Sequence, residues 1–398
     1  MQVKDRFLRY VQLETTSDES SASCPSSEKE WALARLLVEE LRGMGIENAH
    51  TDANGYVYAR IPENTEGQPC IGLIAHMDTS DAVLGPTHPQ VLEKFTGDTV
   101  TLANSLVIDD TDTLRTLQGQ DLVVTDGTSV LGADDKAGVA EIMELASILM
   151  QPDAPAHGPI AIAFTPDEEI GRGADLFDVP AFGADYAYTV DGGALGEIEY
   201  ENFNAASALI TIHGLSFHPG SAKNRMINAA RIAAQFIQML PDAETPEHTE
   251  GYEGFYHLIG MKGDCEEATL TWILRDHDRA RFEQRKQRMQ AISDYLNQVY
   301  PAGTVECVLK DSYYNMREKI EPHMEIIERA QAAFTECGVQ PRIEAIRGGT
   351  DGARLSFMGL PCPNLSTGGY NFHSRKEFIS VQAMETMTRV LLSLVSAK

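Results

Sequence analysis

The stretch Ile71-Gly72-Leu73-Ile74-Ala75-His76-Met77-Asp78 decides the fold that we expect for this chain. Its first five residues form a short, unbroken apolar run, which is typical of a buried strand, and the run ends directly at His76. The apolar runs Pro159–Phe164 and Tyr186–Val190 also end close to acidic residues. Because an α/β sheet presents its strand ends to a ligand, this pattern predicts an α/β fold with a functional site at those ends.

Helical patterns alternate with strand patterns through the first 200 residues. Ser27 and Glu30 fit a capping box that opens a helix, and Ala137–Met150 predicts another. Between them, Tyr56–Ile61 alternates as a strand does. The Ser-rich segment 17–27 is expected to be a loop. This alternation predicts a mostly parallel sheet that is flanked by helices.

The pattern changes from about residue 206. The predicted elements there are the strand Ser207–His213, the helix Asn224–Leu240, the strand Ala268–Arg275, the helix Arg279–Val299 and the strand Thr304–Leu309. Their β-α-β-β-α-β-like order predicts a small α+β domain of the ferredoxin-like kind. The earlier character returns after it and ends in a helix, Val381–Ser396. We therefore expect one discontinuous domain, residues 1–206 and 318–398, interrupted by an inserted domain, residues 207–317.

Composition limits the classes of partner. The chain has 398 residues, 43% of them hydrophobic, which allows a large core and about two domains. Its formal net charge of −27 argues against nucleic acid and anionic membranes as partners, since both attract basic patches. The six cysteines lie far apart without a CxxC pair, as expected for reduced thiols. With an amphipathic N-terminus and no run as long as a membrane span, the sequence predicts a soluble, cytoplasmic protein.

Histidines and acids near the ends of the apolar runs carry the chemistry. They are His76, Asp78, Asp134, Asp135, Glu168, Glu169, Asp191 and His373. Two adjacent divalent metals need imidazoles, terminal carboxylates and one bridging carboxylate, and a further glutamate can activate water. Taken together and in this order, these residues indicate a two-zinc hydrolase.

Each part of this set also has an ordinary structural interpretation. His76 and Asp78 project to the same side of a strand end, where the carboxylate can orient a metal-bound ring, but an isolated pair of this kind is usually part of a loop. Asp134 lies just before a helix and could cap it, although a loop position also suits a bridging ligand. Asp135 is interpreted as a helix cap or a surface acid, and Asp167 as a surface acid.

The remaining residues have similar alternatives. Glu168 and Glu169 can diverge, one binding a metal and the other standing over water, or they can form a surface acidic pair. Asp191 precedes two glycines, so either a turn or a ligand explains it. His373 follows Gly368 and Gly369, which allow the backbone to approach a site closely.

Motifs along nearly the whole chain resemble the M20 family of di-zinc metallopeptidases. They are Ala75–Ser80 (AHMDTS), Leu131–Gly138 (LGADDKAG), Asp167–Gly171 (DEEIG), Thr189–Gly193 (TVDGG), Glu201–Ala206 (ENFNAA), His218–Lys223 (HPGSAK), Arg275–Asp278 (RDHD), Arg347–Gly352 (RGGTDG) and Asn371–His373 (NFH). The resemblance implies that the discontinuous domain is catalytic and that residues 207–317 form a lid and dimerisation domain. It therefore implies a homodimer.

The resemblance also implies how two zinc ions are held. His76 and Asp191 would bind one zinc, Glu169 and His373 would bind the other, and Asp134 would bridge them. A cis peptide bond after Asp134 is implied as well. Cobalt and manganese are the alternatives to zinc.

Five further residues receive roles in catalysis or substrate binding from the resemblance. Asp78 would orient a metal-bound histidine, and Glu168 would be the general base. His218, from the lid, could donate a hydrogen bond to the developing oxyanion. Arg275 and Arg347 would bind the C-terminal carboxylate of the substrate, because a guanidinium binds carboxylate bidentately. The implied activity is release of the N-terminal residue from tripeptides with a free N-terminus.

Two alternatives to this activity stay open. One is another M20 chemistry on the same metal centre, such as that of a dipeptidase, a carboxypeptidase or an N-acyl amino acid deacylase. The other is a peptide-binding protein without catalysis, against which Glu168 and Asp78 argue, because a binder needs neither a base nor an oriented ligand. The sequence leaves the side-chain preference of the substrate and the open or closed state of the lid undetermined.

Overall fold

A computed structural model describes residues 1–397, which divide into two compact units. Unit 1 contains Met1–Tyr200, Met316–Glu344 and the chain from Thr350 onward, and unit 2 contains Glu201–Asn315 and Ala345–Gly349. Unit 2 thus begins at residue 201 where the sequence prediction has 207, because the second sheet already pairs from residue 204. It also includes the short segment 345–349, which the prediction places in the discontinuous domain.

The main sheet of unit 1 has eight strands. In spatial order they are β1 (His50–Thr51), β2 (Val57–Ile61), β8 (Ile160–Thr165), β3 (Ile71–His76), β9 (Tyr186–Gly192), β16 (Asn364–Ser366), β10 (Glu197–Asn202) and β15 (Arg342–Ile346). The predicted α/β class is confirmed. The prediction of a mostly parallel sheet is wrong, because among the strand pairs described in residues 1–397 only the central ones, β8 with β3, β3 with β9 and β9 with β16, are parallel. The pairs β1 with β2, β2 with β8 and β10 with β16 are antiparallel, so the sheet is mixed.

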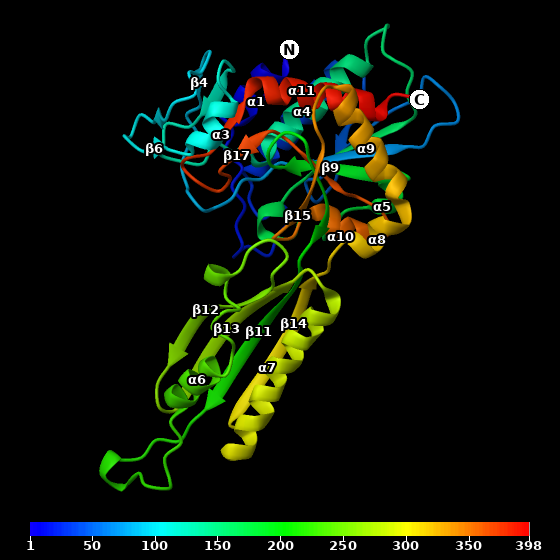
Figure 1. Ribbon diagram of the computed structural model, residues 1–398. Coiled ribbons are helices and arrows are strands. Elements are labelled where there is room, and N and C mark those ends of the chain that lie inside the picture. The colour runs from blue at the N-terminus through cyan, green and yellow to red at the C-terminus, as the bar shows by residue number, and fades with distance from the viewer. Residues whose placement is uncertain (398) are drawn as a thin grey trace. The chain divides into compact units, whose positions relative to one another are not determined.

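Unit 1 also contains helices along its whole length. They are α1 (Val3–Tyr10), α2 (Glu30–Gly43), α3 (Thr111–Thr116), α4 (Ala133–Leu149), α5 (Val179–Phe182), α8 (Arg317–Ile320), α9 (Met324–Glu336), α10 (Asp351–Phe357) and α11 (Val381–Val395), with the 3-10 turns η1 (Glu168–Ile170) and η4 (Glu321–His323). Helices α1, α4 and α11 contact one another, and Figure 1 shows them side by side.

Both faces of the main sheet are covered. β3 is buried at every residue, as expected of a strand between parallel neighbours in a sheet with helices on both sides. Helix α4 packs on β3 and β9. Apolar side chains on the opposite face, including Phe177, Phe182 and Leu355, form a core with Ile74 and Ala163. The strand ends are therefore held from both sides, which places the site residues on a rigid frame.

Residues 80–130 and 369–380 add small strands to unit 1 that the sequence analysis did not predict. A second sheet has the order β17 (Gly369–Tyr370), β18 (Phe378–Ser380), β7 (Leu122–Val124) and β4 (Gln90–Leu92), and β5 (Val100–Thr101) pairs with β6 (Val107–Ile108). These strands have two or three residues each, which is too short for a period-2 pattern to stand out.

Unit 2 is a four-stranded antiparallel sheet with two long helices. Its strands, in spatial order, are β12 (Phe255–Gly263), β13 (Glu267–Asp276), β11 (Asn204–His213) and β14 (Val305–Tyr313), and its helices are α6 (Ala229–Gln238) and α7 (Arg279–Val299), with the 3-10 turns η2 (Pro219–Ser221) and η3 (Pro246–His248). The chain order of these elements confirms the predicted β-α-β-β-α-β arrangement.

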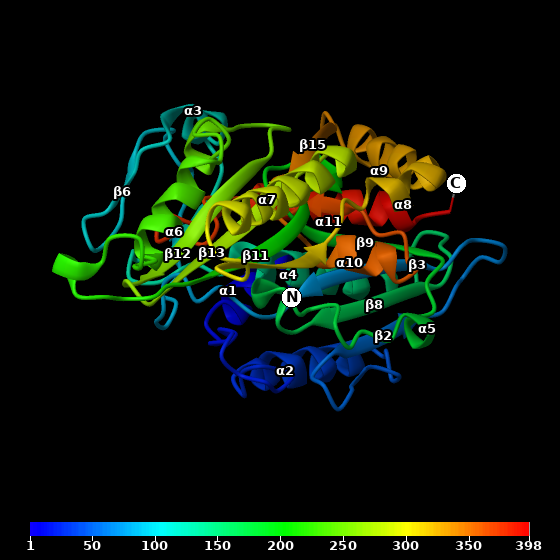
Figure 2. The ribbon, with the colours of Figure 1, turned by 90° about the horizontal axis from the view of Figure 1, so that it is seen from below.

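Both helices of unit 2 cover the same face of its sheet. Ala208 and Ile210 of β11 are buried in a core with Phe236 of α6 and Phe282 of α7, whereas Leu209 between them is exposed. This is the alternation expected of a half-buried strand. Figures 1 and 2 both show α6 and α7 lying along these strands. Within residues 1–397, no helix has the length and apolar character that crossing a membrane requires.

Candidate metal centre

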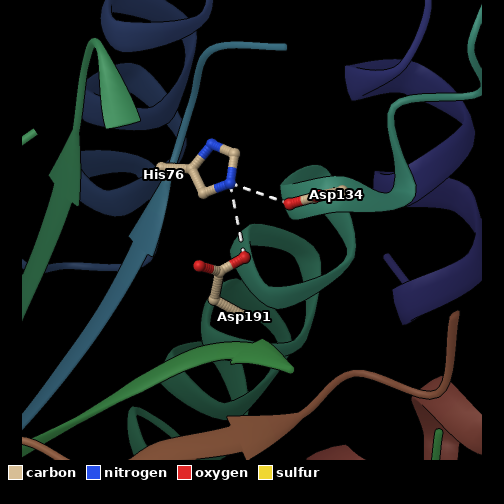
Figure 3. A group of neighbouring side chains, drawn as sticks. All are labelled: His76, Asp134 and Asp191. Carbon is tan, nitrogen blue, oxygen red and sulfur yellow. Dashed lines mark hydrogen bonds and ion pairs between the residues drawn. The ribbon is translucent and has the colours of Figure 1, made fainter. Parts of the chain in front are cut away.

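Two neighbouring strands and the start of α4 bring together one group of metal-binding side chains. His76 ends β3, and Asp191 lies near the end of β9, which pairs with β3 in parallel. Nε2 of His76 is 2.9 Å from Oδ1 of Asp134 and 3.3 Å from Oδ1 of Asp191, as Figure 3 shows. The three residues are spread over more than a hundred positions of the sequence, and the parallel strands β3 and β9 together with the start of α4 bring them to one edge of the sheet.

A second group shares Asp134 with the first. Oδ2 of Asp134 is 2.9 Å from Nε2 of His373, which in turn is 2.8 Å from Oε2 of Glu169. Within each group, the candidate ligand atoms all lie within 4.8 Å of one another. The peptide bond between Asp134 and Asp135 is cis, as the resemblance implied. The Asp134 carboxylate thus contributes one oxygen to each group.

The donors in both groups fit divalent cations. Oε1 of Glu169 is buried and has no hydrogen-bond partner among residues 1–397, so it is available to a cation. Hydrogen bonds to Asp134 and Glu169 raise the pKa of His373 to about 11, and the acids around His76 raise its pKa well above the ordinary value. The surrounding carboxylates therefore favour positive charge here, and imidazole nitrogen with carboxylate oxygen is a donor set that zinc accepts.

Asp78 connects the first imidazole to both glutamates. Its carboxylate is fully buried, with Oδ1 3.3 Å from Nδ1 of His76. It also accepts the backbone N–H of Glu168 at 3.0 Å and that of Glu169 at 3.1 Å. A carboxylate on the far nitrogen of a metal-binding histidine fixes the tautomer and the direction of the ring. Asp78 can therefore orient His76 and, at the same time, hold the turn that carries Glu168 and Glu169.

Glu168 begins the turn η1, which follows β8 after two intervening residues. Its side chain lines a small recess together with His76, Asp191, Thr165 and Asp351. Burial raises the pKa of Glu168 well above the ordinary value, while the charge of His76 opposes that shift. A carboxyl group with a raised pKa beside a metal site can take up a proton near neutral pH.

The interpretation of Asp135 and Asp167 as surface acids is wrong. Both side chains are fully buried. Oδ2 of Asp135 accepts the N–H of His76 at 3.1 Å, and Oδ1 accepts that of Gly138 at 3.1 Å, so the helix-capping interpretation describes part of its role. Both oxygens of Asp167 accept the N–H of Ser26 at 2.9 Å. Backbone donors in the interior stabilise these carboxylates there, and this explains why they lie away from solvent.

Glu377 was not identified from the sequence, and it contacts the backbone of the segment that carries Asp134. Its carboxylate is buried and accepts backbone N–H groups from the segment Leu131–Asp134. Burial raises the pKa of Glu377 to about 7, and the backbone donors oppose that shift because they favour the ionised form. In the sequence it is one acid in a polar segment of an acidic chain, and no pattern distinguishes it.

The three residues expected to bind substrate all belong to unit 2. His218 is exposed, and its Nδ1 accepts the N–H of Gly220 at 3.2 Å at the start of η2. Arg275 on β13 donates from one terminal nitrogen to the carbonyls of Leu274 at 2.9 Å and Ala206 at 3.4 Å. These contacts describe unit 2 by itself and do not place the three residues relative to the metal centre.

Both terminal nitrogens of Arg347 donate hydrogen bonds within unit 2, whereas only one terminal nitrogen of Arg275 does. One terminal nitrogen donates to the carbonyls of Gly251 at 2.6 Å and Glu253 at 3.1 Å. The other donates to the carbonyl of Thr249 at 3.3 Å and to its hydroxyl at 3.2 Å. Arg347 therefore holds the loop 249–253, and of its nitrogens only Nε is not used in these contacts.

Comparison with known proteins places this arrangement in a class. Residues 200–304 match the M20 peptidase dimerisation domain, which corresponds to most of unit 2. An aminopeptidase PepT from Bacillus cereus is 22% identical with a TM-score of 0.78, and a tripeptidase from Staphylococcus aureus is 20% identical with a TM-score of 0.80. Both likenesses cover 99% of this chain and 97% of the other. The fold and the matched domain define an M20-type metallopeptidase.

Relatives at higher identity narrow the class to one family. A peptidase T from Halothermothrix orenii is 53% identical over 99% of this chain and 98% of its own length. A peptidase T from Aliivibrio salmonicida is 52% identical over 99% of this chain and 97% of its own. The chain belongs to the peptidase T family.

Proposed function

We propose that this protein is a tripeptide aminopeptidase that uses two zinc ions. The observation that carries the proposal is Asp134, whose two oxygens serve two separate groups of nitrogen and oxygen donors. Two findings support tripeptides as the substrate. The chain belongs to the peptidase T family, and a structural neighbour from Staphylococcus aureus is described as a tripeptidase.

The two donor groups define the proposed metal ligands. His76 and Asp191 would hold one zinc, Glu169 and His373 would hold the other, and Asp134 would bridge them. A solved neighbour, the YXEP protein from Bacillus subtilis, is described as a dinuclear metal-binding peptidase. Cobalt and manganese are alternatives to zinc, because both accept the same imidazole and carboxylate donors.

Glu168 and Asp78 perform the remaining chemistry at the centre. When bound, two divalent ions lower the pKa of water and polarise a peptide carbonyl. Glu168 takes a proton from the attacking water as its oxygen bonds to the peptide carbon, and it then passes that proton to the leaving nitrogen as the carbon–nitrogen bond breaks. Asp78 keeps His76 in one orientation through Nδ1 and fixes the backbone from which Glu168 projects.

Unit 2 supplies the proposed contacts to the substrate. Nε and one terminal nitrogen of Arg275 are not used in the contacts described above, and this edge of a guanidinium binds a carboxylate bidentately. Arg347 would add a donor from Nε while it holds the loop 249–253. Because Nδ1 of His218 accepts an N–H, its neutral ring carries a proton on Nε2, which suits donation to an oxyanion.

The domain roles, assembly and location of the protein follow from the same proposal. Residues 1–206 and 318–398 would form the catalytic domain, and residues 207–317 would act as a lid and as the interface of a homodimer, in keeping with the matched dimerisation domain. We place the enzyme in the cytoplasm, where its six cysteines, none of which forms a disulfide, would remain thiols.

Assays on a peptide panel test the proposed substrate. The panel contains di-, tri- and tetrapeptides, each with a free and a blocked N-terminus, and the protein is used metal-depleted and zinc-restored. We expect release of the N-terminal residue from free tripeptides by the zinc-restored protein alone. Preferred cleavage of dipeptides or of blocked substrates would instead assign a different M20 chemistry, and binding without cleavage would reject catalysis.

The Glu168→Gln substitution tests the general base separately. It should leave binding of both metals intact and lower kcat by a factor of at least about 100, because Gln cannot accept the proton. Glu66→Gln makes the same chemical change at an exposed position and should leave kcat unchanged. Substantial turnover by Glu168→Gln with both metals bound would reject Glu168 as the base.

A further inference from the structure

Glu377 accepts hydrogen bonds from four consecutive backbone N–H groups. Its carboxylate is 1% exposed. Oε2 accepts from Leu131 at 2.7 Å and from Gly132 at 3.0 Å, and Oε1 accepts from Ala133 at 2.7 Å and from Asp134 at 3.2 Å. Both oxygens are thus occupied by backbone donors, so Glu377 is not itself a candidate metal ligand.

The backbone of this segment is shaped to receive a carboxylate. Gly132 has a φ of 77°, a left-handed conformation that L side chains rarely adopt. A Cβ at this position would also lie 3.2 Å from Cγ2 of Thr79. Alternation of handedness along the chain turns successive N–H groups toward one point, which creates a concave anion site. Glu377 is the anion that fills it.

One hydrogen bond of Glu377 comes from the backbone of Asp134, the residue that belongs to both donor groups. The last N–H in the series belongs to Asp134, whose side chain contributes an oxygen to each group. Glu377 also lies four residues after His373 in the same polar segment. One buried carboxylate therefore joins the segment that carries the shared aspartate to the segment that carries a histidine of the second group.

We propose that Glu377 is a positioning residue for the metal centre, which holds Asp134 and the His373 segment at the spacing that two metal ions require. The inference rests on the proposed function in one respect, namely that the two donor groups bind metal. It goes beyond that function because Glu377 belongs to neither donor group and acts through the backbone of Leu131–Asp134.

The Glu377→Gln substitution replaces one of the two accepting oxygens of the side chain with an NH₂ group. The side-chain amide keeps nearly the same volume, but its NH₂ group cannot accept, so two of the four backbone N–H groups lose their partner. Loss of a group that orients a metal ligand typically costs about 10–100-fold in metal affinity. The second group, Asp134 with Glu169 and His373, should lose more affinity than the first, because Glu377 is connected to two of its three members.

Titration calorimetry with Zn²⁺ on the metal-depleted full-length protein measures this effect. Wild type, Glu377→Gln and Glu141→Gln are compared at a temperature at which circular dichroism shows all three folded. Glu141 on α4 is a matched control, since it is also fully buried but has no hydrogen-bond partner among residues 1–397. We expect two Zn²⁺ sites in wild type and in Glu141→Gln, and a weaker second site in Glu377→Gln, with activity restored by excess Zn²⁺.

Two results would be contrary, and they have different meanings. Wild type that binds no Zn²⁺ would overturn the proposed function itself. Wild type with two sites and Glu377→Gln with the same two affinities would overturn the positioning role alone. If Glu377→Gln does not fold, Glu377→Asp keeps the charge on a side chain one methylene shorter, and unchanged affinity of its second site would likewise reject the role.

Discussion

His76 and Asp135 are joined by a hydrogen bond from the backbone N–H of the histidine to Oδ2 of the aspartate, 3.1 Å long. The preceding residue, Asp134, contacts the same histidine through the ring. Two consecutive acids thus act on one histidine in different ways, one on its backbone and one on its imidazole. The end of β3 and the start of α4 are fixed to each other independently of any metal.

Asp135→Asn should lower the stability of the protein. The amide leaves either His76 or Gly138 without an acceptor in a fully buried position, which costs about 1–3 kcal/mol. Urea unfolding of metal-depleted protein measures the change. Asp121→Asn, which alters a carboxylate that accepts the N–H of Lys94 near the surface, serves as the control and should cost less. Equal stabilities of Asp135→Asn and wild type would contradict this account of Asp135.

Glu141→Gln should stabilise the protein increasingly as the pH rises. Burial raises the pKa of Glu141 well above its ordinary value of 4.5, so the folded chain keeps a proton that the unfolded chain has already released. The contribution of Glu141 is therefore fully present below about pH 4.5 and is lost as the pH rises toward the folded pKa. Gln does not titrate. Differential scanning calorimetry should show a Tm advantage for Glu141→Gln at pH 8 that shrinks toward pH 5, and a pH-independent difference would refute it.

Arg275→Lys and Arg347→Lys should produce different defects. Lysine cannot bind a carboxylate bidentately, so Arg275→Lys should raise KM for tripeptides by roughly 10–100-fold with a smaller change in kcat. Arg347→Lys should instead destabilise unit 2 by about 2 kcal/mol, because a guanidinium that donates four hydrogen bonds to the loop 249–253 is lost. Steady-state kinetics measures KM and urea unfolding measures stability for both variants. Equal changes of KM and of stability in the two variants would contradict the different roles of Arg275 and Arg347.

His218→Ala should lower kcat and leave metal content unchanged. Removal of one oxyanion donor typically lowers kcat by about 10²–10³-fold. His213→Ala is the matched control, since His213 is also exposed in unit 2 and has no assigned role. Metal analysis and kcat are measured on the same preparations. A normal kcat for His218→Ala would remove this histidine from the mechanism.

The strands that carry the site could be predicted because their signal is local. β3 and β9 are apolar runs of five or more residues, and the polar residue after each run marks the edge at which a ligand binds. Residue type and position therefore made His76 and Asp191 candidates, whereas their assignment to one metal came from the family resemblance. β12 was not predicted, since Phe255–Gly263 has one buried residue, Tyr256, among exposed and half-buried ones and shows no regular alternation.

The buried acids behind the site could not be predicted, and the reason is physical. A carboxylate such as Asp135 or Glu377 is stabilised inside the protein by backbone N–H groups, which every residue except proline possesses. No side-chain pattern marks the donor, so an acid of this kind looks in the sequence like any other acid of a chain with 59 Asp and Glu residues. Only the folded backbone reveals the contact.

The contact between Arg347 and the loop 249–253 bears on the order in which the protein is made. The two partners are 94 to 98 positions apart in the sequence, and the arginine comes last. Because synthesis proceeds from the N-terminus, the ribosome completes the sheet and both long helices of unit 2 well before it adds the residue that holds this loop. A nascent chain that ends at Asn315 contains all four strands of the antiparallel sheet of unit 2 but not the arginine that donates to the carbonyls of Thr249, Gly251 and Glu253. Arg347 can therefore form these hydrogen bonds only after most of the first unit has been translated.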